Sequence, residues 1–237
     1  IPLSFTLMQA SSKEIVKTST LGLKLKAYAA FFKLRLASLV VFSAIMGYFI
    51  AAEGIYWLDL FYLSIGGFLV TGASNGFNQI IEKDLDKLMT RTQDRPLVTG
   101  KMTVNEAYVV ASVSAFVGIA MLWIALNPLS GILGALALFL YVAIYTPLKQ
   151  ITSWAVFVGD FPGAIPPMLG WVAYTGEFGL EPGLLFALQF MWQFPHFWAI
   201  AWKVNDDYNK AGFHLLPSKG GKDLTSAFMI LLYCLFM

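Results

Sequence analysis

The sequence predicts an all-α protein, a polytopic bundle of transmembrane helices. Of its 237 residues, 58% are hydrophobic and only 13% are charged, and the mean hydropathy is +0.68. A soluble globular domain carries about 25% charged residues, so these charges could not cover a water-facing surface. Aromatic residues make up 16% of the chain, which is typical of proteins with aromatic belts at the membrane surface. The chain also contains repeated apolar runs, and together these features exclude a soluble enzyme.

Six of the apolar runs are long enough to span a bilayer, because a crossing helix needs about 20 mostly apolar residues. We expect spans at residues 36–52, 58–81, 107–126, 129–145, 154–173 and 183–202. A last run, residues 224–237, is too short to cross, and the chain begins with Ile1 rather than Met. We therefore expect a fragment of a longer protein, with a truncated seventh span. Residues 1–30 are predicted to be a polar interfacial segment, and residues 31–237 a transmembrane domain that is incomplete at its C-terminus.

The basic residues predict the orientation of the bundle. All 16 Lys and Arg residues precede the first span, follow the sixth, or lie in the loops after the second and fourth spans. Basic loops remain in the cytoplasm, so the N-terminus and these loops are expected on the cytoplasmic side. No cleavable signal peptide is recognisable, and we expect an integral protein of the bacterial plasma membrane. The net charge of +2 is too small to indicate a nucleic-acid partner.

Polar side chains line the end of the second span. Asn78, Glu82 and Asp86 are spaced four residues apart, so a continuing helix places them on one face, which Asn75 joins. Such a stripe suits a hard cation, because Mg²⁺ favours one or two carboxylates together with phosphate oxygens of a substrate. The alternative is an ordinary charged helix end, in which the acids pair with neighbouring lysines of the same helix. Taken alone, the stripe favours the charged helix end.

Two arginines follow the stripe and favour the first interpretation. Arg91 and Arg95 are four residues apart, and the guanidinium fork matches phosphate oxygens in a bidentate way. A diphosphate needs cations around it, and acidic residues hold it only through a bridging metal. The acids and the arginines together therefore predict a site for a metal-bound diphosphate.

The later loops and spans add further candidates, each with an alternative interpretation. Lys149 is either a phosphate contact or a charge that sets topology, and Tyr145 is either an interfacial residue or a ring that faces a carbocation. His196, inside the sixth span, is either a substrate contact, for example to a porphyrin, or a helix–helix hydrogen bonder.

Acidic residues occur in two further places. Asp206 and Asp207 follow the sixth span and predict a second acidic site that faces the same diphosphate. Asp160 lies in the fifth span among prolines and glycines, which break a helix where it lines a cavity. The alternative for Asp160 is a residue that is hydrogen-bonded at the kink.

These motifs resemble, in order, those of the UbiA-type intramembrane prenyltransferases. The run from Asn78 through Glu82 to Asp86 is similar to the first acidic signature of that family. The extension with Arg91 and Arg95 resembles the branch of protoheme IX farnesyltransferases. Residues 145–149 and 163–171 are similar to the middle region of this branch, and residues 195–198 and 206–217 resemble its second acidic signature.

The resemblance implies helices around a central cavity and the transfer of a farnesyl group from farnesyl diphosphate to the 2-vinyl group of protoheme IX, giving haem O. It implies Mg²⁺ as cofactor, with the ligands Asn78, Glu82, Asp86, Asp206 and Asp207. The catalytic set is completed by Arg91, Arg95, Lys149 and Tyr145, and the haem is oriented by Asn75 and His196. The implied partners are the lipid bilayer and either a haem A synthase or an oxidase assembly factor. Glu82 stands where many members have Asp, and Asp206 and Asp207 depart from the spaced aspartates of quinone-forming relatives.

Three other functions remain as alternatives. A sister prenyltransferase would act on a quinone precursor, but the arginine pair and the Pro-His-Phe-Trp run beginning at Pro195 argue against it. A transporter would place ionisable residues near the bilayer midplane, whereas these cluster at one surface. A non-catalytic scaffold for oxidase assembly would tolerate mutation of Glu82 and Asp86.

Overall fold

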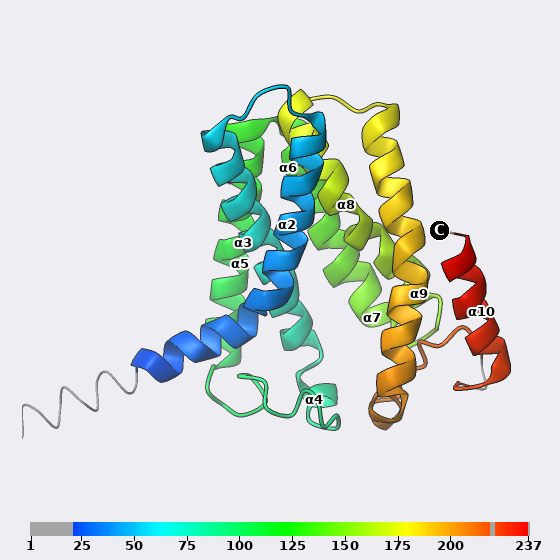
Figure 1. Ribbon diagram of the computed structural model, residues 1–237. Helices are drawn as coiled ribbons and strands as arrows, with labels where there is room; N and C mark the ends of the chain where they lie inside the picture. The colour runs from blue at the N-terminus through cyan, green and yellow to red at the C-terminus, as the bar shows by residue number, and fades with distance from the viewer. Residues whose placement is uncertain (1–20, 219–220, 237) are drawn as a thin grey trace, which may run out of the picture.

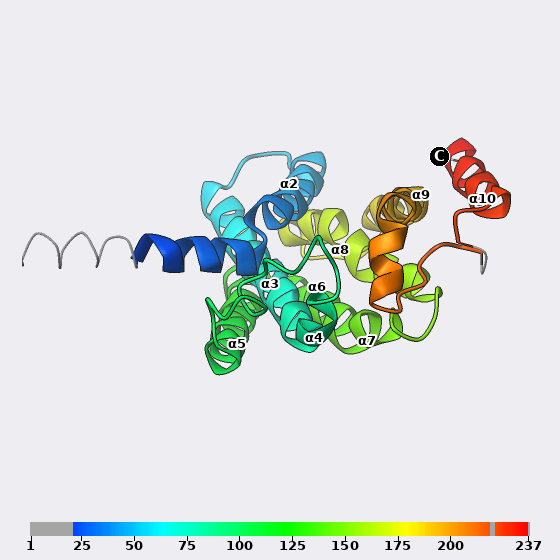
Figure 2. The ribbon, with the colours of Figure 1, turned by 90° about the horizontal axis from the view of Figure 1, so that it is seen from below.

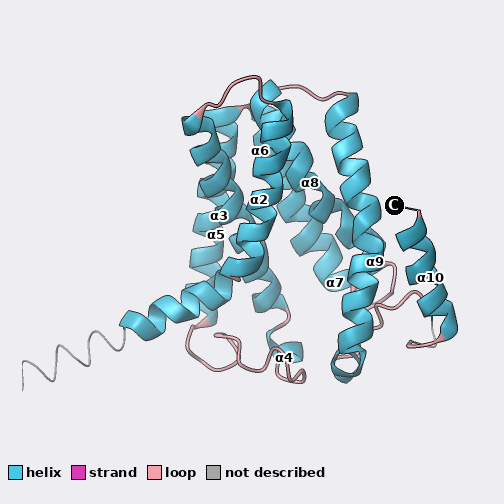
Figure 3. Cartoon of the chain, viewed as in Figure 1, coloured by secondary structure: helices cyan, strands magenta, loops and turns pink. Residues whose placement is uncertain are grey.

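The computed structural model describes residues 21–218 and 221–236, and these residues form helices and loops without strands (Figure 3). A first helix covers residues 21–32. It is followed by α2 (Leu34–Ala51), α3 (Trp57–Ile81), α4 (Lys83–Asp86), α5 (Val104–Met121), η1 (Leu122–Leu126), α6 (Pro128–Phe139), η2 (Leu140–Tyr145), α7 (Thr146–Leu148), α8 (Ala155–Thr175), α9 (Leu180–Lys210) and α10 (Leu224–Leu235). The segments η1 and η2 are π-helical. The fold is thus all-α, as predicted. Of the polar segment expected at residues 1–30, residues 1–20 lie outside the described residues, as does Met237 of the last apolar run.

Five helical segments are long and apolar enough to cross a membrane: Leu34–Ala51, Trp57–Ile81, Val104–Leu126, Pro128–Leu148 and Ala155–Thr175. They coincide with the first five predicted spans to within a few residues. The sixth predicted span lies inside α9, which is less apolar but runs alongside the others (Figure 1). The number of spans therefore remains a prediction. Large apolar side chains such as Phe116 and Ile124 are 76% and 82% exposed, as expected of helices that face lipid.

Helices α2 and α8 approach each other closely because glycines lie at their contact. A Cβ atom on Gly47 would overlap the carbonyl oxygen of Pro167, and one on Gly170 would overlap the carbonyl oxygen of Ala44. Small residues at membrane helix interfaces allow this backbone-to-backbone packing. The buried aromatic ring of Tyr48 packs in the same apolar core.

The first helix meets α2 at a sharp elbow (Figure 1). Lys33, at the elbow, has φ 51° and ψ 59° and is the one non-glycine residue with positive φ in the described part of the chain. Two buried amides of α3 hold the elbow, because Asn75 Nδ2 donates to the carbonyl of Phe32 (3.3 Å) and Gln79 Nε2 donates to that of Phe31 (2.7 Å). The polar end of α3 thereby fixes the direction in which α2 begins.

The loop between α4 and α5 lies beneath the bundle (Figure 2). Met89 of this loop is buried in a core cluster that also contains Phe213, just beyond the end of α9. Leu97 and Met102 are buried in a second cluster with Phe31. The loop is therefore packed at both ends, and it closes the end of the bundle at which α3 and α9 terminate.

Candidate diphosphate-binding site

The acidic stripe predicted from the sequence forms at the end of α3. The helix breaks at Glu82, but its amide still donates to the Asn78 carbonyl (3.0 Å), and the Asp86 amide donates to the Glu82 carbonyl (2.8 Å). These bonds carry the helical register across the break, so the stripe remains on one face. The side chains of Asn75, Asn78, Glu82 and Asp86 are all buried. The intervening Asp84 is exposed.

Each acid of the stripe pairs with a base that is distant in sequence or lies in the following loop. Lys149 Nζ is 2.5 Å from Glu82 Oε1, and Arg95 donates to Asp86 Oδ2 at 2.5 Å. The side chains of these pairs are between 1% and 15% exposed. Lys87 pairs with the exposed Asp84 at 2.6 Å. The stripe is therefore not an ordinary helix end in which acids pair with neighbouring lysines.

Burial opposes the charged forms of these groups. It raises the pKa of Asp86, although the Arg95 guanidinium counteracts this, and it lowers the pKa of Lys149, although the Glu82 carboxylate counteracts that. Buried ion pairs are costly to desolvate and gain little net stability over apolar residues. Their retention at the end of a membrane bundle fits a binding role better than a role in stability.

Lys33 is a further cation of this site that the sequence analysis did not assign. Burial, together with the positive charges of Arg95 and Lys149, lowers the pKa of Lys33 to about 7. Glu82 and Arg91 also lie within electrostatic range of its ammonium. Four bases thus face two buried acids, and this excess of positive charge favours an anionic ligand. No local pattern marks Lys33, because its position depends on the elbow between two helices.

Tyr145 and Thr146 border the site at the end of η2. Lys149 Nζ lies 5.0 Å from the centroid of the Tyr145 ring. Asn78 Nδ2 donates to Thr146 Oγ1 (3.3 Å), which in turn donates to the Tyr141 carbonyl (2.8 Å). π-Helical turns are often found at functional sites, and this one brings an aromatic ring next to the buried ion pairs.

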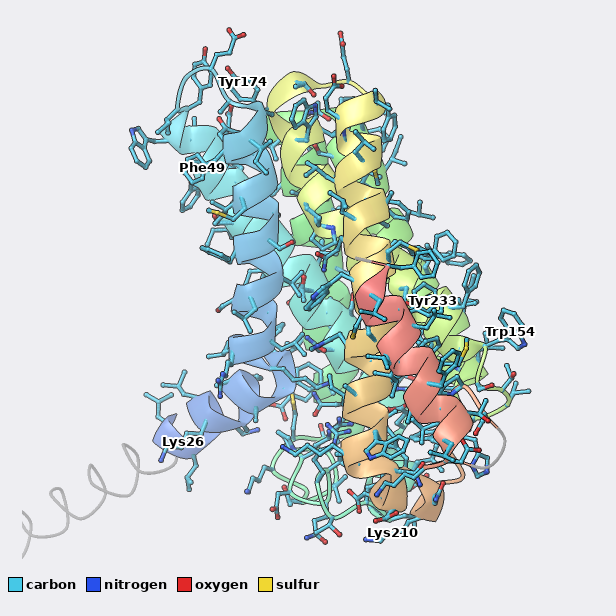
Figure 4. All side chains as sticks on the ribbon, turned by 45° about the vertical axis from the view of Figure 1, so that its right-hand side comes forward. Lys26, Phe49, Trp154, Tyr174, Lys210 and Tyr233 are labelled. Carbon is cyan, nitrogen blue, oxygen red and sulfur yellow. The ribbon has the colours of Figure 1, made fainter. Side chains whose placement is uncertain are left out.

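Asp207 holds the arginine-bearing loop rather than joining the acidic stripe. Its carboxylate accepts the backbone amides of Thr90 (2.8 Å) and Arg91 (3.0 Å) and pairs with Lys210 at 2.9 Å (Figure 4 labels Lys210). The Arg91 amide, followed by the Lys210 ammonium, holds the pKa of Asp207 well below its usual range. The Arg91 guanidinium lies 5.7 Å from the ring centroid of Tyr208. Arg91 is thus positioned by both its backbone and its side chain.

Two predicted residues are not joined to the stripe. Asp206 is exposed and lies 3.3 Å from Lys222. His196 is exposed and stacks on Trp192, with ring centroids 4.6 Å apart. Within residues 21–218 and 221–236, no hydrogen bond or ion pair links His196 to the acidic stripe. Their roles in metal and haem binding remain predictions.

Comparison with known proteins identifies the family of this chain. Residues 40–237 match the UbiA prenyltransferase family. The chain belongs to the UbiA prenyltransferase family. It is 54% identical over 201 residues to "Protoheme IX farnesyltransferase" of Christiangramia forsetii, a match that covers 85% of this chain and 66% of the relative. The protein of the same name from Flavobacterium psychrophilum is 51% identical over 210 residues, with 86% and 69% covered. The chain therefore spans about two thirds of the length of the curated relatives it matches.

Solved structures of UbiA-type proteins share the fold. A digeranylgeranylglyceryl phosphate synthase aligns with a TM-score of 0.73 at 20% identity, over 90% of this chain and 74% of its own. A UbiA homologue from Archaeoglobus fulgidus, bound to GPP and Mg²⁺, aligns with a TM-score of 0.64 at 16% identity, over 87% and 71%. At these identities the likeness establishes the fold and no more.

The stripe of this UbiA-family protein suits Mg²⁺ if a phosphate ligand supplies the remaining oxygens. In the described part of the chain, no three His, Cys, Asp or Glu side chains are close enough to bind one ion. Mg²⁺, however, is usually held by one or two carboxylates together with substrate phosphates. Asp86 Oδ1 is buried without a hydrogen-bond partner, which leaves a hard oxygen ligand free. The donor set therefore fits a metal that arrives with a diphosphate.

Proposed function

We propose that this prenyltransferase transfers a farnesyl group from farnesyl diphosphate to the 2-vinyl group of protoheme IX, giving haem O. The names of the relatives that are 50–54% identical support this choice of substrates. The observation that carries the proposal is the buried cluster at the end of α3, where Glu82 and Asp86 face Lys149 and Arg95. Such a cluster suits a leaving group of high negative charge.

The bases of the cluster would grip the diphosphate. Arg95 pairs with Asp86 and Lys149 pairs with Glu82, and both bases would turn toward phosphate oxygens if a metal occupied these carboxylates. Arg91 lies on the same loop as Arg95, between α4 and α5. Guanidinium groups bind phosphate in a bidentate way. Asn78, Glu82 and Asp86 would hold Mg²⁺, which when bound neutralises charge on the departing diphosphate.

The rest of the bundle would protect the reactive carbon. When the allylic C–O bond breaks, the electron pair leaves with the diphosphate and the farnesyl carbon becomes cationic. The Tyr145 ring borders the buried ion pairs, and the electron-rich face of an aromatic ring stabilises a nearby cation. The apolar helices exclude bulk water from this carbon until the vinyl π bond attacks it.

We further propose that the site faces the cytoplasm of a bacterial cell, with the protein in the plasma membrane. The distribution of Lys and Arg supports this orientation, because basic loops remain inside. The product would pass to a haem A synthase or to an oxidase assembly partner, since haem O is useful only when it is modified further or inserted.

The proposal is tested with the variants Asp86→Asn and Arg91→Ala in lipid nanodiscs, by assay of haem O formation with Mg²⁺ or EDTA. Loss of one electrostatic contact to a transition state costs about a hundredfold in rate, so each variant should lose about that much. Asp84→Asn is the matched control, because Asp84 is exposed and pairs only with Lys87. Wild-type rates in Asp86→Asn or Arg91→Ala, or full activity in EDTA, would contradict the proposal.

A further inference from the structure

Asp160 is a fully buried carboxyl group in the second turn of α8 (Ala155–Thr175). Its side chain is 0% exposed, and neither carboxylate oxygen has a hydrogen-bond partner in the described part of the chain. An ionisable residue inside a membrane span is costly and is a functional candidate by default. A hydrogen-bonded residue at a helix kink would use at least one of these oxygens. Among the described residues, no such bond is made by the side chain of Asp160.

The surroundings of Asp160 are unusually polar for a membrane bundle. Gln193 of α9 donates to the backbone carbonyl of Asp160 (3.1 Å), and its side chain lies against Gly163. Three prolines lie within the same continuous helix, and each lacks the N–H that would pair with the carbonyl four residues earlier; they are Pro162, Pro166 and Pro167. Buried polar groups without protein partners are where internal water binds.

Asp160 lies beside the proposed reaction site. The ring of Tyr145 packs so closely on Gly159 that a Cβ atom there would overlap it. Lys149 Nζ lies 5.0 Å from the centroid of the same ring. Asp160 follows Gly159 directly in α8, so its backbone lies next to the same ring. Tyr145 therefore lies between the diphosphate site and Asp160.

The proposed reaction needs a water molecule and a proton acceptor next to the reacting carbon. The farnesyl carbon that reacts is bonded to the diphosphate, so in the proposed complex it lies at the edge of the ion-pair cluster, which Tyr145 also borders. Attack by the vinyl group moves the positive charge to the vinyl carbon attached to the porphyrin. Capture of that cation by water makes the hydroxyl group of haem O and releases a proton, which Glu82 and Asp86 would not take while they hold the metal.

We infer that Asp160 binds this water and acts as its general base, an inference that rests on the proposed function. The water oxygen forms a bond to the cationic carbon, one of its O–H bonds breaks, and the Asp160 carboxylate takes the proton.

The test measures haem O, dehydrated farnesyl haem and released diphosphate in three variants: Asp160→Asn, Asp160→Ser and Asp160→Glu. Asn has nearly the shape of Asp but does not accept a proton, and Ser binds water without acting as a base.

We expect diphosphate release from farnesyl diphosphate, in the presence of haem, to stay within about threefold of wild type. Haem O formation should fall at least about a hundredfold in the Asn and Ser variants, the usual range for loss of a general base. A farnesylated haem that is lighter by one water should accumulate, because the cation then loses a proton instead. Glu should restore part of the haem O.

Two results would overturn the inference. One is haem O formed at the wild-type rate and proportion by any folded variant that lacks the carboxyl group. The other is an equal loss of diphosphate release and haem O, which would indicate a structural role. Asp84→Asn serves again as the control for removal of a carboxylate. Failure of the proposed function is seen separately, since the wild-type protein would then form no haem O at all.

Discussion

The two ends of the helical bundle both contain polar contacts, but these contacts are of different kinds. At the end near α4, buried acids pair with buried bases, as in Glu82 with Lys149. At the opposite end, near Tyr174 in Figure 4, the polar contacts are neutral. Tyr174 Oη accepts the amide of Glu53 (3.1 Å), and Asn127 Nδ2 donates to the carbonyl of Val172 (2.9 Å).

This difference indicates that the neutral end contributes to stability, whereas the charged end serves ligand binding. A neutral hydrogen bond contributes about 0.5–1.5 kcal/mol to the free energy of unfolding, and it offers no charge to attract a charged ligand. A buried ion pair contributes little net stability, but each partner left alone is costly. The charged end is therefore stable only while its charges are matched, either by one another or by a ligand and its metal.

The largest effect is expected from Lys149→Met, which leaves the Glu82 carboxylate buried without its partner. Removal of one member of a buried ion pair destabilises a protein by about 3–5 kcal/mol. We expect this loss in the free energy of unfolding, measured by denaturant titration in mixed micelles, together with loss of haem O formation.

The double variant Glu82→Gln with Lys149→Met sharpens the same comparison. It removes both charges, so most of the stability should return while the activity stays lost. If activity returned together with stability, these residues would be structural and the contrast between the two ends would be wrong.

A smaller effect is expected from the pH dependence of diphosphate binding through Lys33. Its pKa is about 7, and it is faced by Arg91, Arg95, Lys149 and Glu82. The protonated form attracts the anion, and a bound anion raises the pKa of Lys33 in turn. The affinity gained from Lys33 is therefore fully present below pH 7 and is lost as the pH rises from 7 through the higher pKa of the complex. One pKa unit corresponds to about 1.4 kcal/mol, or about tenfold in affinity.

The measurement is calorimetric binding of inorganic diphosphate with Mg²⁺ between pH 6 and about 8.5, in wild type and Lys33→Met. The ratio of the two affinities cancels the protonation of the diphosphate itself. A ratio that stays constant with pH would show that Lys33 does not contact the ligand.

The smallest effect is expected at the neutral end, from Asn127→Ala. Asn127 caps α6 by accepting the amide of Ser130 (2.9 Å), and loss of such a cap costs about 1 kcal/mol. Thermal unfolding should show this decrease, while haem O formation per folded molecule should be unchanged. A loss of activity beyond the loss of folded protein would mean that both ends of the bundle serve the reaction.

The sequence predicted the helices and the acidic stripe because both depend on local spacing. Apolar runs of sufficient length place the spans, and the intervals between Asn78, Glu82 and Asp86 place these residues on one face. The pairing of Glu82 with Lys149 could not be predicted, since it joins residues of different helices whose approach depends on packing. Lys33 was missed for the same reason, because its side chain is aimed by an elbow that buried amides of α3 hold.

The second acidic region shows a different limit of local reasoning. Asp206 and Asp207 are neighbours in sequence, and the sequence analysis predicted that both face the diphosphate as a second acidic site. In the structure Asp207 accepts two amides of the arginine loop, and Asp206 is exposed on another face of the helix. Adjacent residues of a helix point about 100° apart, so only one of them could contact that loop.

The glycine contact between α2 and α8 bears on how an isoprenoid reaches the bundle. At Gly47 and Gly170 the two backbones touch, and no gap is left for a hydrocarbon tail to slip through. The contact between α2 and α8 is therefore closed to lipid, and a lipid substrate must enter the bundle between other helices. A larger side chain at Gly170 would push α2 and α8 apart and would let lipid enter the bundle between these two helices.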